Sequence, residues 1–180
     1  MAMGQERHRT RPPPLDAEAL ERAALRYVER YATSRAKLAF YLQRKLRERG
    51  WEGEGEPPVE RLVERMAELR YVDDRAFAAA RGASLGRRGY GERRVSEALR
   101  AAGIGESDAE EARAQARSEA WAAALRFAER RRIGPFATVE ADPAKREKAM
   151  AAMLRAGHPM SIARRLVSAR PGEVPEADIV

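Results

Sequence analysis

The sequence predicts an all-α protein built as an array of three tandem three-helix repeats, and three observations support this prediction. Alanine is the commonest residue, at 36 of 180, and Arg, Glu and Leu are also abundant; all four have high helix propensity. Apolar residues recur at helical spacing between capping and turn residues. Three expected helix ends are evenly spaced, at Gly50, Gly103 and Gly157, which is typical of stacked supersecondary units.

The first repeat is expected over residues 16–71. Asp16 caps a helix that extends to about Tyr31. A second helix starts at Thr33-Ser34, ends at Gly50 in a left-handed C-cap, and carries apolar residues four positions apart, Leu38, Leu42 and Leu46. Pro57-Pro58 suit the first turn of a third helix, whose apolar face is formed by Leu62, Val63, Met66 and Leu69.

The second repeat is expected over residues 72–117. Asp73-Asp74 open a helix that turns Phe77 and Ala80 inward, and we expect its glycines to interrupt it, at Gly82, Gly86 and Gly89. A helix from Gly91 to Gly103 holds Val95 and Leu99. Ser107-x-x-Glu110 is a capping box, which predicts the start of the next helix.

The third repeat is expected over residues 118–170. One helical pattern continues through Trp121 to about Arg132, with a break that the sequence does not place. Asp142-Pro143 start a helix that ends at Gly157, and a last helix occupies residues 159–169. The remaining residues are expected to form a flexible basic N-terminal tail, residues 1–15, and a C-terminal tail, residues 171–180.

Internal repetition supports the division into three. Each of the three glycines follows an aliphatic residue by four positions, and those residues are Leu46, Leu99 and Met153. The heptapeptide ALRYVER at 24–30 also recurs as ALRFAER at 124–130. Chance similarity in a chain rich in Ala and Arg is the alternative, but the matched helix ends favour true repetition.

The residue inventory excludes several kinds of site. The chain has no cysteine and two isolated histidines, His8 and His158, so it lacks the donors of a thiolate or His-rich metal centre. The spacing of Gly86, Gly89 and Gly91 does not fit a phosphate-binding loop. The carboxylate pair Asp73-Asp74 fits a helix cap and acidic first turn better than a catalytic dyad. We therefore expect no catalytic residue, no metal and no cofactor.

No apolar run approaches 18 residues, so we expect no membrane span. The basic N-terminus has no apolar stretch behind it, which argues against a signal peptide. These features predict a cytoplasmic protein with no membrane partner. The charge and the absence of long heptads suggest a monomer.

The net charge of +7 is distributed unevenly along the chain. Residues 35–49 contain six basic residues against Glu48, and residues 81–100 contain six against two acidic residues. Arg126 and Arg130 to Arg132 form a third basic group, and acidic segments at 52–60 and 106–111 alternate with these groups. A solvated helix face would mix the signs within each turn, so we interpret the distribution as a basic stripe for a polyanion or an acidic partner, opposite an acidic surface.

Arginine outnumbers lysine 31 to 4, and coding bias explains most of that choice. The aromatic residues, among them Tyr27, Tyr31, Phe40 and Tyr41, lie at helical spacing and are expected mostly in the core rather than at a base-stacking surface. Tyr90, between two glycines, is the best candidate for an exposed ring. The residues by themselves thus predict a basic helical-repeat protein that binds rather than catalyses.

The central segment resembles the RecX family of regulators of the RecA recombinase. The resemblance is carried by Tyr71-Val72-Asp73-Asp74-x-x-Phe77-Ala78, by Arg88-Gly89-Tyr90-Gly91-x-Arg93-Arg94-Val95, and by Leu99 to Gly103-Ile104. Ser34-Arg35-x-x-Leu38 with Leu42, Leu46 and Gly50-Trp51 is similar to the opening pattern of the family. The third repeat fits more loosely, with His158 where the family often has an aromatic residue and 133–141 as an insertion.

The resemblance implies an elongated array of three tandem three-helix repeats that has no enzymatic activity. It also implies a protein that binds RecA and its filament on single-stranded DNA, lodges in the filament groove, and suppresses strand exchange, ATP hydrolysis and co-protease activity. These roles belong to DNA repair and the SOS response. We assign RecA or DNA contacts to the basic residues and one ring of the first two repeats: Arg35, Lys37, Arg44, Lys45, Arg87, Arg88, Tyr90, Arg93 and Arg94.

Two other interpretations stay open. Residues 142–169 superficially resemble a helix-turn-helix, so the protein could be a direct DNA-binding regulator that acts without RecA, although an ordinary repeat hairpin is the favoured interpretation of this segment. The basic stripe could also bind single- or double-stranded DNA. A helical scaffold for some other acidic partner is the third interpretation, and it has only the repeats in its favour.

Overall fold

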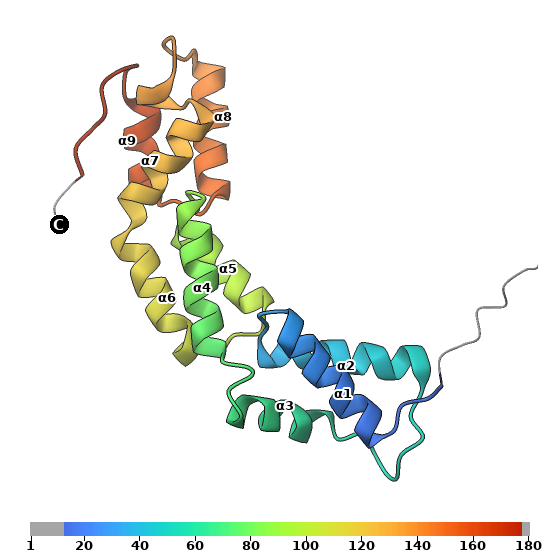
Figure 1. Cartoon of the computed structure of the whole chain (residues 1–180). Coiled ribbons are helices and arrows are strands. Elements are labelled where there is room, and N and C mark those ends of the chain that lie inside the picture. Colours follow the sequence, from blue (N-terminus) through green and yellow to red (C-terminus); the bar gives the residue numbers. More distant parts are fainter. Residues whose placement is uncertain (1–12, 178–180) are drawn as a thin grey trace, which may run out of the picture. The chain divides into compact units, whose positions relative to one another are not determined.

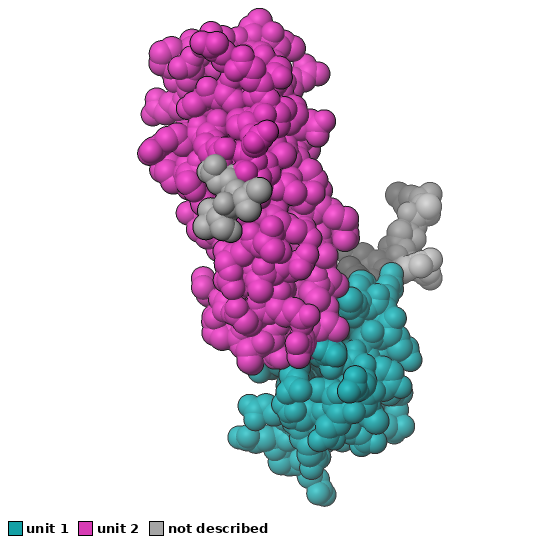
Figure 2. Space-filling model, turned by 90° about the vertical axis from the view of Figure 1, so that its left-hand side faces the viewer, with its two compact units in different colours: residues 1–73 teal, residues 74–180 magenta. Residues whose placement is uncertain are grey.

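The computed structural model describes residues 13–177, which form nine α-helices and one short 3-10 helix (Figure 1). No strand occurs in this range; its only extended pairing is an isolated bridge between Leu15 and Trp51. The contacts divide the chain into two compact units, residues 1–73 and 74–180 (Figure 2). The predicted all-α class is confirmed.

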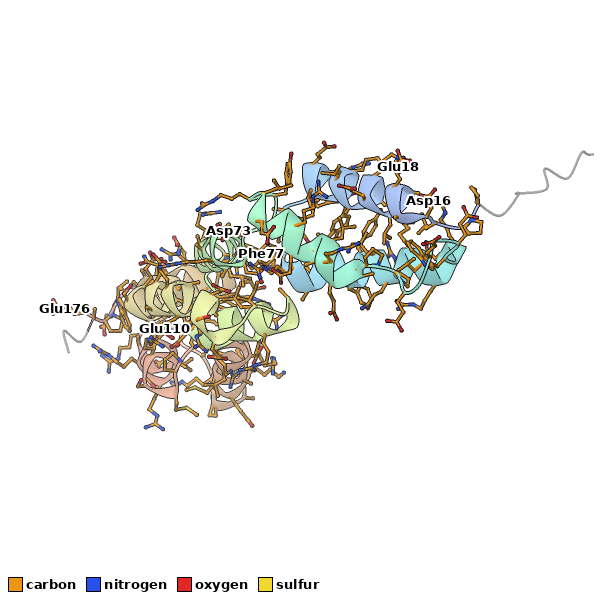
Figure 3. The ribbon with its side chains drawn as sticks, turned by 90° about the horizontal axis from the view of Figure 1, so that it is seen from below. Asp16, Glu18, Asp73, Phe77, Glu110 and Glu176 are labelled. Atoms are coloured by element: carbon orange, nitrogen blue, oxygen red, sulfur yellow. The ribbon has the colours of Figure 1, made fainter. Side chains whose placement is uncertain are left out.

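Unit 1 contains three helices, α1 (Ala17–Arg30), α2 (Arg35–Arg49) and α3 (Val59–Glu68). The predicted caps are present: the Asp16 carboxylate, at the start of α1 in Figure 3, accepts a hydrogen bond from the Ala19 amide at 2.7 Å, and the Ser34 hydroxyl accepts one from the Lys37 amide at 3.2 Å. Gly50 ends α2 with φ +91°, a conformation that glycine adopts without a steric penalty.

The core of unit 1 draws on all three helices: Leu20, Ala23, Ala24, Leu38, Leu42, Val59, Leu62, Val63 and Met66. Leu15 is 1% exposed and belongs to this core, although we expected it in the N-terminal tail. Its amide donates to the Gly50 carbonyl and its own carbonyl accepts from the Glu52 amide, both at 3.0 Å. Residues 1–12 of the expected tail lie outside the described residues.

The first three helices of unit 2 are α4 (Asp74–Arg87), α5 (Glu92–Ala101) and α6 (Glu106–Ser118). The expected interruption of α4 is wrong at Gly82 and Gly86, because the helix continues through both. At Gly82 the reason is packing: a Cβ there would lie 3.3 Å from the Ala112 Cβ, so glycine lets α4 approach α6 closely. The two helices lie side by side in Figure 1.

Two further expectations for this region are wrong. Ala80 is exposed, and Ala78 and Leu85 are the residues that α4 turns into the core. The expected capping box at Ser107 does not start α6, whose N-cap is Gly105, without a side-chain cap. Ser107 lies inside the first turn, where its hydroxyl cannot serve as the N-cap acceptor.

The second half of unit 2 contains α7 (Ala120–Arg131), a 3-10 turn (Gly134–Phe136), α8 (Pro143–Arg155) and α9 (Met160–Ser168). The break that the sequence did not place falls at Glu119, between α6 and α7. The Asp142 carboxylate accepts a hydrogen bond from the Lys145 amide at 2.8 Å, as its predicted role at the start of α8 requires. The three helices enclose a core of Ala124, Phe127, Ala128, Met153, Ala163, Leu166 and Val167.

Backbone contacts join the two halves of unit 2. The Gly91 amide donates to the Ala156 carbonyl at 2.9 Å. A Cβ on Gly157 would lie 2.4 Å from the Arg94 amide nitrogen, and Gly157 has φ +91°. The turn after α8 therefore packs directly on the first turn of α5, at a separation that no side chain permits.

The helices also group in threes. Each of the three buried clusters is formed by three consecutive helices. Gly50, Gly103 and Gly157 follow the second helix of each group, with φ of +91°, +71° and +91°. The matched heptapeptides at 24–30 and 124–130 lie in the first helices of their groups, α1 and α7. This arrangement is consistent with three tandem repeats, and the exact repeat boundaries stay a prediction.

Candidate binding surfaces

In unit 1 the predicted basic residues lie at the two ends of α2. Arg35 and Lys37 are in its first turn, and Arg44 and Lys45 are in its last turns. The rise of an α-helix separates these two pairs by roughly 13 Å. The structure therefore does not bring the four residues together into one cluster.

Each end of α2 has a carboxylate partner. The Arg35 guanidinium lies 3.2 Å from Glu64 of α3, and Arg44 and Lys45 lie 3.6 Å and 3.1 Å from Glu48. The hydrogen bond from Lys45 holds the pKa of Glu48 below its usual range. These pairs are solvent-exposed, and such pairs contribute little to stability. The cations can therefore exchange their carboxylates for an external anion at small cost.

The aromatic residues of unit 1 are less buried than the sequence indicated. Tyr27 and Tyr41 are partly buried against the core, but Tyr31 is 49% exposed and Phe40 is 61% exposed. The Arg47 guanidinium lies 5.9 Å from the Phe40 ring centroid. Helical spacing does not separate a core ring from one at the edge of the core, because burial depends on where the neighbouring helix crosses.

In unit 2 the predicted ring, Tyr90, is half-buried and packs against both core clusters of the unit. The expectation of an exposed ring is therefore corrected. Two cations lie near the ring: the guanidinium of Arg88 is 5.3 Å from the ring centroid and that of Arg130 is 6.0 Å from it. The sequence did not single out Arg130 as a site residue, since only the fold brings α7 beside this turn.

The other predicted cations of unit 2 differ in their surroundings. Arg93 donates a hydrogen bond to the Leu154 carbonyl on α8, so it has a structural role between the halves of the unit. Arg94 lies 3.3 Å from Glu97 and is exposed. Arg87 is exposed and has no ion pair within residues 13–177. It is the cation of this set most available to a partner.

Arg87 and Tyr90 also line a hollow of about 360 Å³ between α4 and α6. Alanine and glycine form most of its wall, and the polar residues around it include Gln115 and Glu119. Arg126, 3.8 Å from Glu119, donates to the Gly86 carbonyl at 3.2 Å.

The acidic segment of residues 106–111 does not form the free acidic surface that we expected. Glu106 and Glu110 bind Arg113, and Glu110 also binds Arg117 at 2.9 Å. Hydrogen bonds from Arg117, which has the larger effect, and from Arg113 hold the pKa of Glu110 below its usual range. The helical spacing of these residues on α6 brings the opposite charges together, and Figure 3 shows Glu110 on this helix.

His158 is the one buried histidine within the described residues, at 4% exposure. Its Nε2 lies 3.1 Å from the Gly89 carbonyl oxygen, and its Nδ1 has no hydrogen-bond partner there. Burial lowers the pKa of His158 to about 4, although the Gly89 hydrogen bond acts in the opposite direction. The imidazole is therefore neutral at pH 7, with Nε2 carrying the proton that it donates to Gly89.

Among residues 13–177 there is no group of three or more His, Asp or Glu side chains that could hold a metal ion. Over the same residues, none of the helices has both the length and the apolar character that crossing a bilayer requires. The fold and these surfaces thus define a class: an all-helical protein whose exposed features are arginine-rich helix ends beside aromatic rings.

Comparison with known proteins gives the family. The chain is 31% identical to the regulatory protein RecX of Myxococcus xanthus (strain DK1622) over an alignment of 178 residues, which covers 93% of this chain and 94% of the relative. The crystal structure of RecX from Lactobacillus salivarius superposes with a TM-score of 0.61 at 17% identity, covering 84% of this chain and 94% of that one.

A second crystal structure, of a regulatory protein RecX, gives a TM-score of 0.58 at 20% identity over 83% of this chain and 72% of that one. No protein-family model matches the sequence. The sequence relationship extends over nearly the full length of both proteins, and the solved structures share the fold. The chain belongs to the RecX family of regulatory proteins.

Proposed function

We propose that this protein binds RecA and the RecA filament on single-stranded DNA, lodges in the filament groove, and inhibits the recombinase, ATPase and co-protease activities of RecA. In this role it regulates DNA repair and the SOS response from the cytoplasm. The observation that carries the proposal is the 31% identity to a regulatory protein RecX over 93% of the chain. The protein acts as a non-enzymatic monomer.

The exposed cations support this proposal. A filament groove contains protein carboxylates and DNA phosphates, and arginine can bind either group through two parallel hydrogen bonds. Arg87, Arg88 and Arg94 are exposed in unit 2, the first two beside Tyr90, and Arg35, Lys37 and Arg44 are exposed on α2 in unit 1. We propose these residues, with Lys45, as the contacts. Arg93 contributes by holding α8 in place.

The decisive experiment is a titration of the cognate RecA ATPase on single-stranded DNA with the full chain. We expect inhibition well below one protein per RecA, because one molecule in the groove affects several RecA subunits. An ATPase rate that stays constant up to equimolar protein contradicts the proposal.

Direct DNA binding without RecA is the second candidate function. The observation in its favour is the pair α8 and α9, joined by the short turn at Gly157, which has the connectivity of a helix-turn-helix. A retention experiment separates the two candidates. The proposed function requires much stronger retention on RecA filaments than on naked DNA, and equal retention favours direct DNA binding.

A further inference from the structure

Unit 1 contains a hollow of about 540 Å³ between the C-terminal parts of α1 and α2. It is lined by three tyrosines and four cations: Arg26, Tyr27, Arg30, Tyr31, Tyr41, Arg44 and Lys45. Among the described residues, no acidic side chain lines it. All seven lining residues belong to unit 1, so the hollow does not depend on the position of unit 2.

The three rings form one continuous aromatic surface. Tyr27 and Tyr41 are stacked, with ring centroids 4.1 Å apart and an interplanar angle of 15°. Tyr31 lies 5.2 Å from Tyr27 and is 49% exposed. The stacked pair is held against the core, so Tyr31 is the ring with most room for a ligand. Covering a half-exposed aromatic ring with a flat apolar surface lowers the free energy of the complex, because apolar area is removed from water.

The cations surround these rings. The Arg30 guanidinium lies 5.5 Å from the Tyr31 centroid, and Arg44 and Lys45 lie 5.8 Å and 5.9 Å from the Tyr41 centroid. Glu48 balances part of this charge from outside the lining. The hollow therefore combines faces on which a flat ring can stack with donors that can bind phosphate oxygens.

The internal repeat provides a comparison for Tyr27. In the matched heptapeptides, Tyr27 corresponds to Phe127, which is 3% exposed and packs in the core of unit 2. Both rings pack against a core and both have cations nearby, since Arg130 and Arg131 lie 5.5 Å and 5.8 Å from the Phe127 centroid. The difference is that Tyr27 also stacks on Tyr41 and lies beside the half-exposed Tyr31, which leaves an aromatic surface open in unit 1.

We propose that this hollow binds a single-stranded nucleic acid, with one unstacked base against Tyr31 and the neighbouring phosphates on Arg26, Arg30, Arg44 and Lys45. Base stacking on aromatic side chains combined with a basic track is the general chemistry of single-strand binding. An acidic peptide would satisfy the cations but leave the rings uncovered, and a duplex would present phosphates without free base faces. The biological setting rests on the proposed function, but binding itself requires no RecA.

The test is the affinity of the full chain for a fluorescent 15-nucleotide oligothymidylate, measured by anisotropy without RecA. The comparison ligand is an abasic oligomer with the same number of phosphates. We expect about tenfold tighter binding to the thymidylate, because stacking of one base on an aromatic ring is worth about that factor. Equal affinity for the two oligomers overturns the proposal.

Substitutions of the exposed rings show which side chain stacks on the base. Tyr31→Ala is expected to lower thymidylate affinity to the abasic level, and Tyr31→Phe is expected to retain the preference because it keeps the ring. Phe40→Ala is the matched control, since Phe40 is also exposed beside an arginine but lies outside the hollow. Circular dichroism checks that each variant keeps its helices. If Tyr31→Ala binds thymidylate like the unaltered protein, the hollow is not the base site.

Three further results separate the possible failures. A polyglutamate peptide that binds more tightly than thymidylate of equal charge would indicate a protein partner and overturn the proposal. If RecA ATPase is inhibited but no base preference exists, the proposed function survives and the base site fails. If the base preference exists but RecA is unaffected, the base site survives and the proposed function fails.

Discussion

The imidazole Nε2 of His158 lies 3.1 Å from the carbonyl oxygen of Gly89, and this contact joins the turn after α8 to the turn after α4. The ring is buried and also lies 5.5 Å, centroid to centroid, from Phe127. The turn after α4 carries Arg88 and Tyr90 of the basic surface. The neutral state of the His158 imidazole therefore affects how firmly the turn after α4, with its basic surface, is held against the turn after α8.

The first prediction concerns pH. Because the pKa of His158 is about 4 in the folded protein and 6.5 as the ordinary value, the unfolded chain binds a proton first as the pH falls. We expect the free energy of unfolding to decrease from about pH 6.5 to about pH 4, by about 3 kcal/mol in total. Urea unfolding at a series of pH values measures this loss.

The control for this prediction is His158→Phe, which cannot titrate and retains an aromatic ring against Phe127. Its stability at pH 7 can differ, because Gly89 loses its donor, but its slope with pH between about 6.5 and 4.5 should be smaller. Identical slopes for the variant and the unaltered protein would show that His158 is not the titrating group.

The second prediction concerns Gly157. We expect Gly157→Ala to destabilise unit 2 by about 1–3 kcal/mol, because the new Cβ would meet the Arg94 amide at 2.4 Å and the residue has φ +91°. Gly172→Ala is a matched control, since Gly172 has φ +85° and a Cβ there would meet nothing within 4 Å. Thermal unfolding compares the two, and equal losses would mean that the backbone angle alone matters.

The third prediction concerns the basic surface around Tyr90. We expect the double variant Arg87→Glu, Arg88→Glu to need about tenfold more protein for half-inhibition of RecA ATPase, the size of effect expected when charge contacts are reversed at an interface. Arg93 is left unchanged because it donates a hydrogen bond to the Leu154 carbonyl. Substituting it could weaken inhibition by destabilising the fold rather than by removing a contact with the partner.

A variant with the same change of charge elsewhere in unit 2 controls for net charge. Arg155 and Arg164 are exposed and lie outside the predicted contact set. If Arg155→Glu, Arg164→Glu weakens inhibition as much as the Arg87 and Arg88 variant, total charge rather than this surface determines the effect.

The fourth prediction concerns salt. Four cations line the tyrosine hollow, which is the hollow of unit 1 lined by Tyr27, Tyr31 and Tyr41. Each phosphate neutralised on a single strand contributes about −0.7 to the slope of log K against log salt. We expect a slope of about −3 for thymidylate binding, reduced in size by about 0.7 in Arg44→Gln. Tyr31→Ala should lower the affinity without changing the slope, because stacking releases no counterions. Anisotropy titrations between about 50 and 200 mM salt give these slopes.

Much of the fold could be predicted from local residues. Asp16, Ser34 and Asp142 cap helices as expected, and the three spaced glycines end helices where the repetition placed them. A cap or a left-handed turn depends on a few consecutive residues, so the sequence contains the necessary information. The glycines inside α4 misled the prediction, because Gly82 serves the packing of a helix distant in sequence.

The candidate surfaces could be predicted only in part. The basic residues were recognisable from the sequence, but the ion pairs with Glu48, Glu64 and Glu97 depend on the fold or on helix geometry. Arg130 lies near the Tyr90 ring only because tertiary packing brings α7 beside the turn after α4. The tyrosine hollow was missed altogether, since stacking of Tyr27 on Tyr41 joins two helices.

The sequence by itself thus determined the helical class, most helix ends, the grouping of positive charge and the resemblance to the RecX family, because these follow from propensity, capping and motif order along the chain. The tertiary structure decided which rings are open, which charges pair between different helices, and which glycines permit close packing. Those properties depend on which surfaces of distant helices meet, and no local pattern in the chain specifies that.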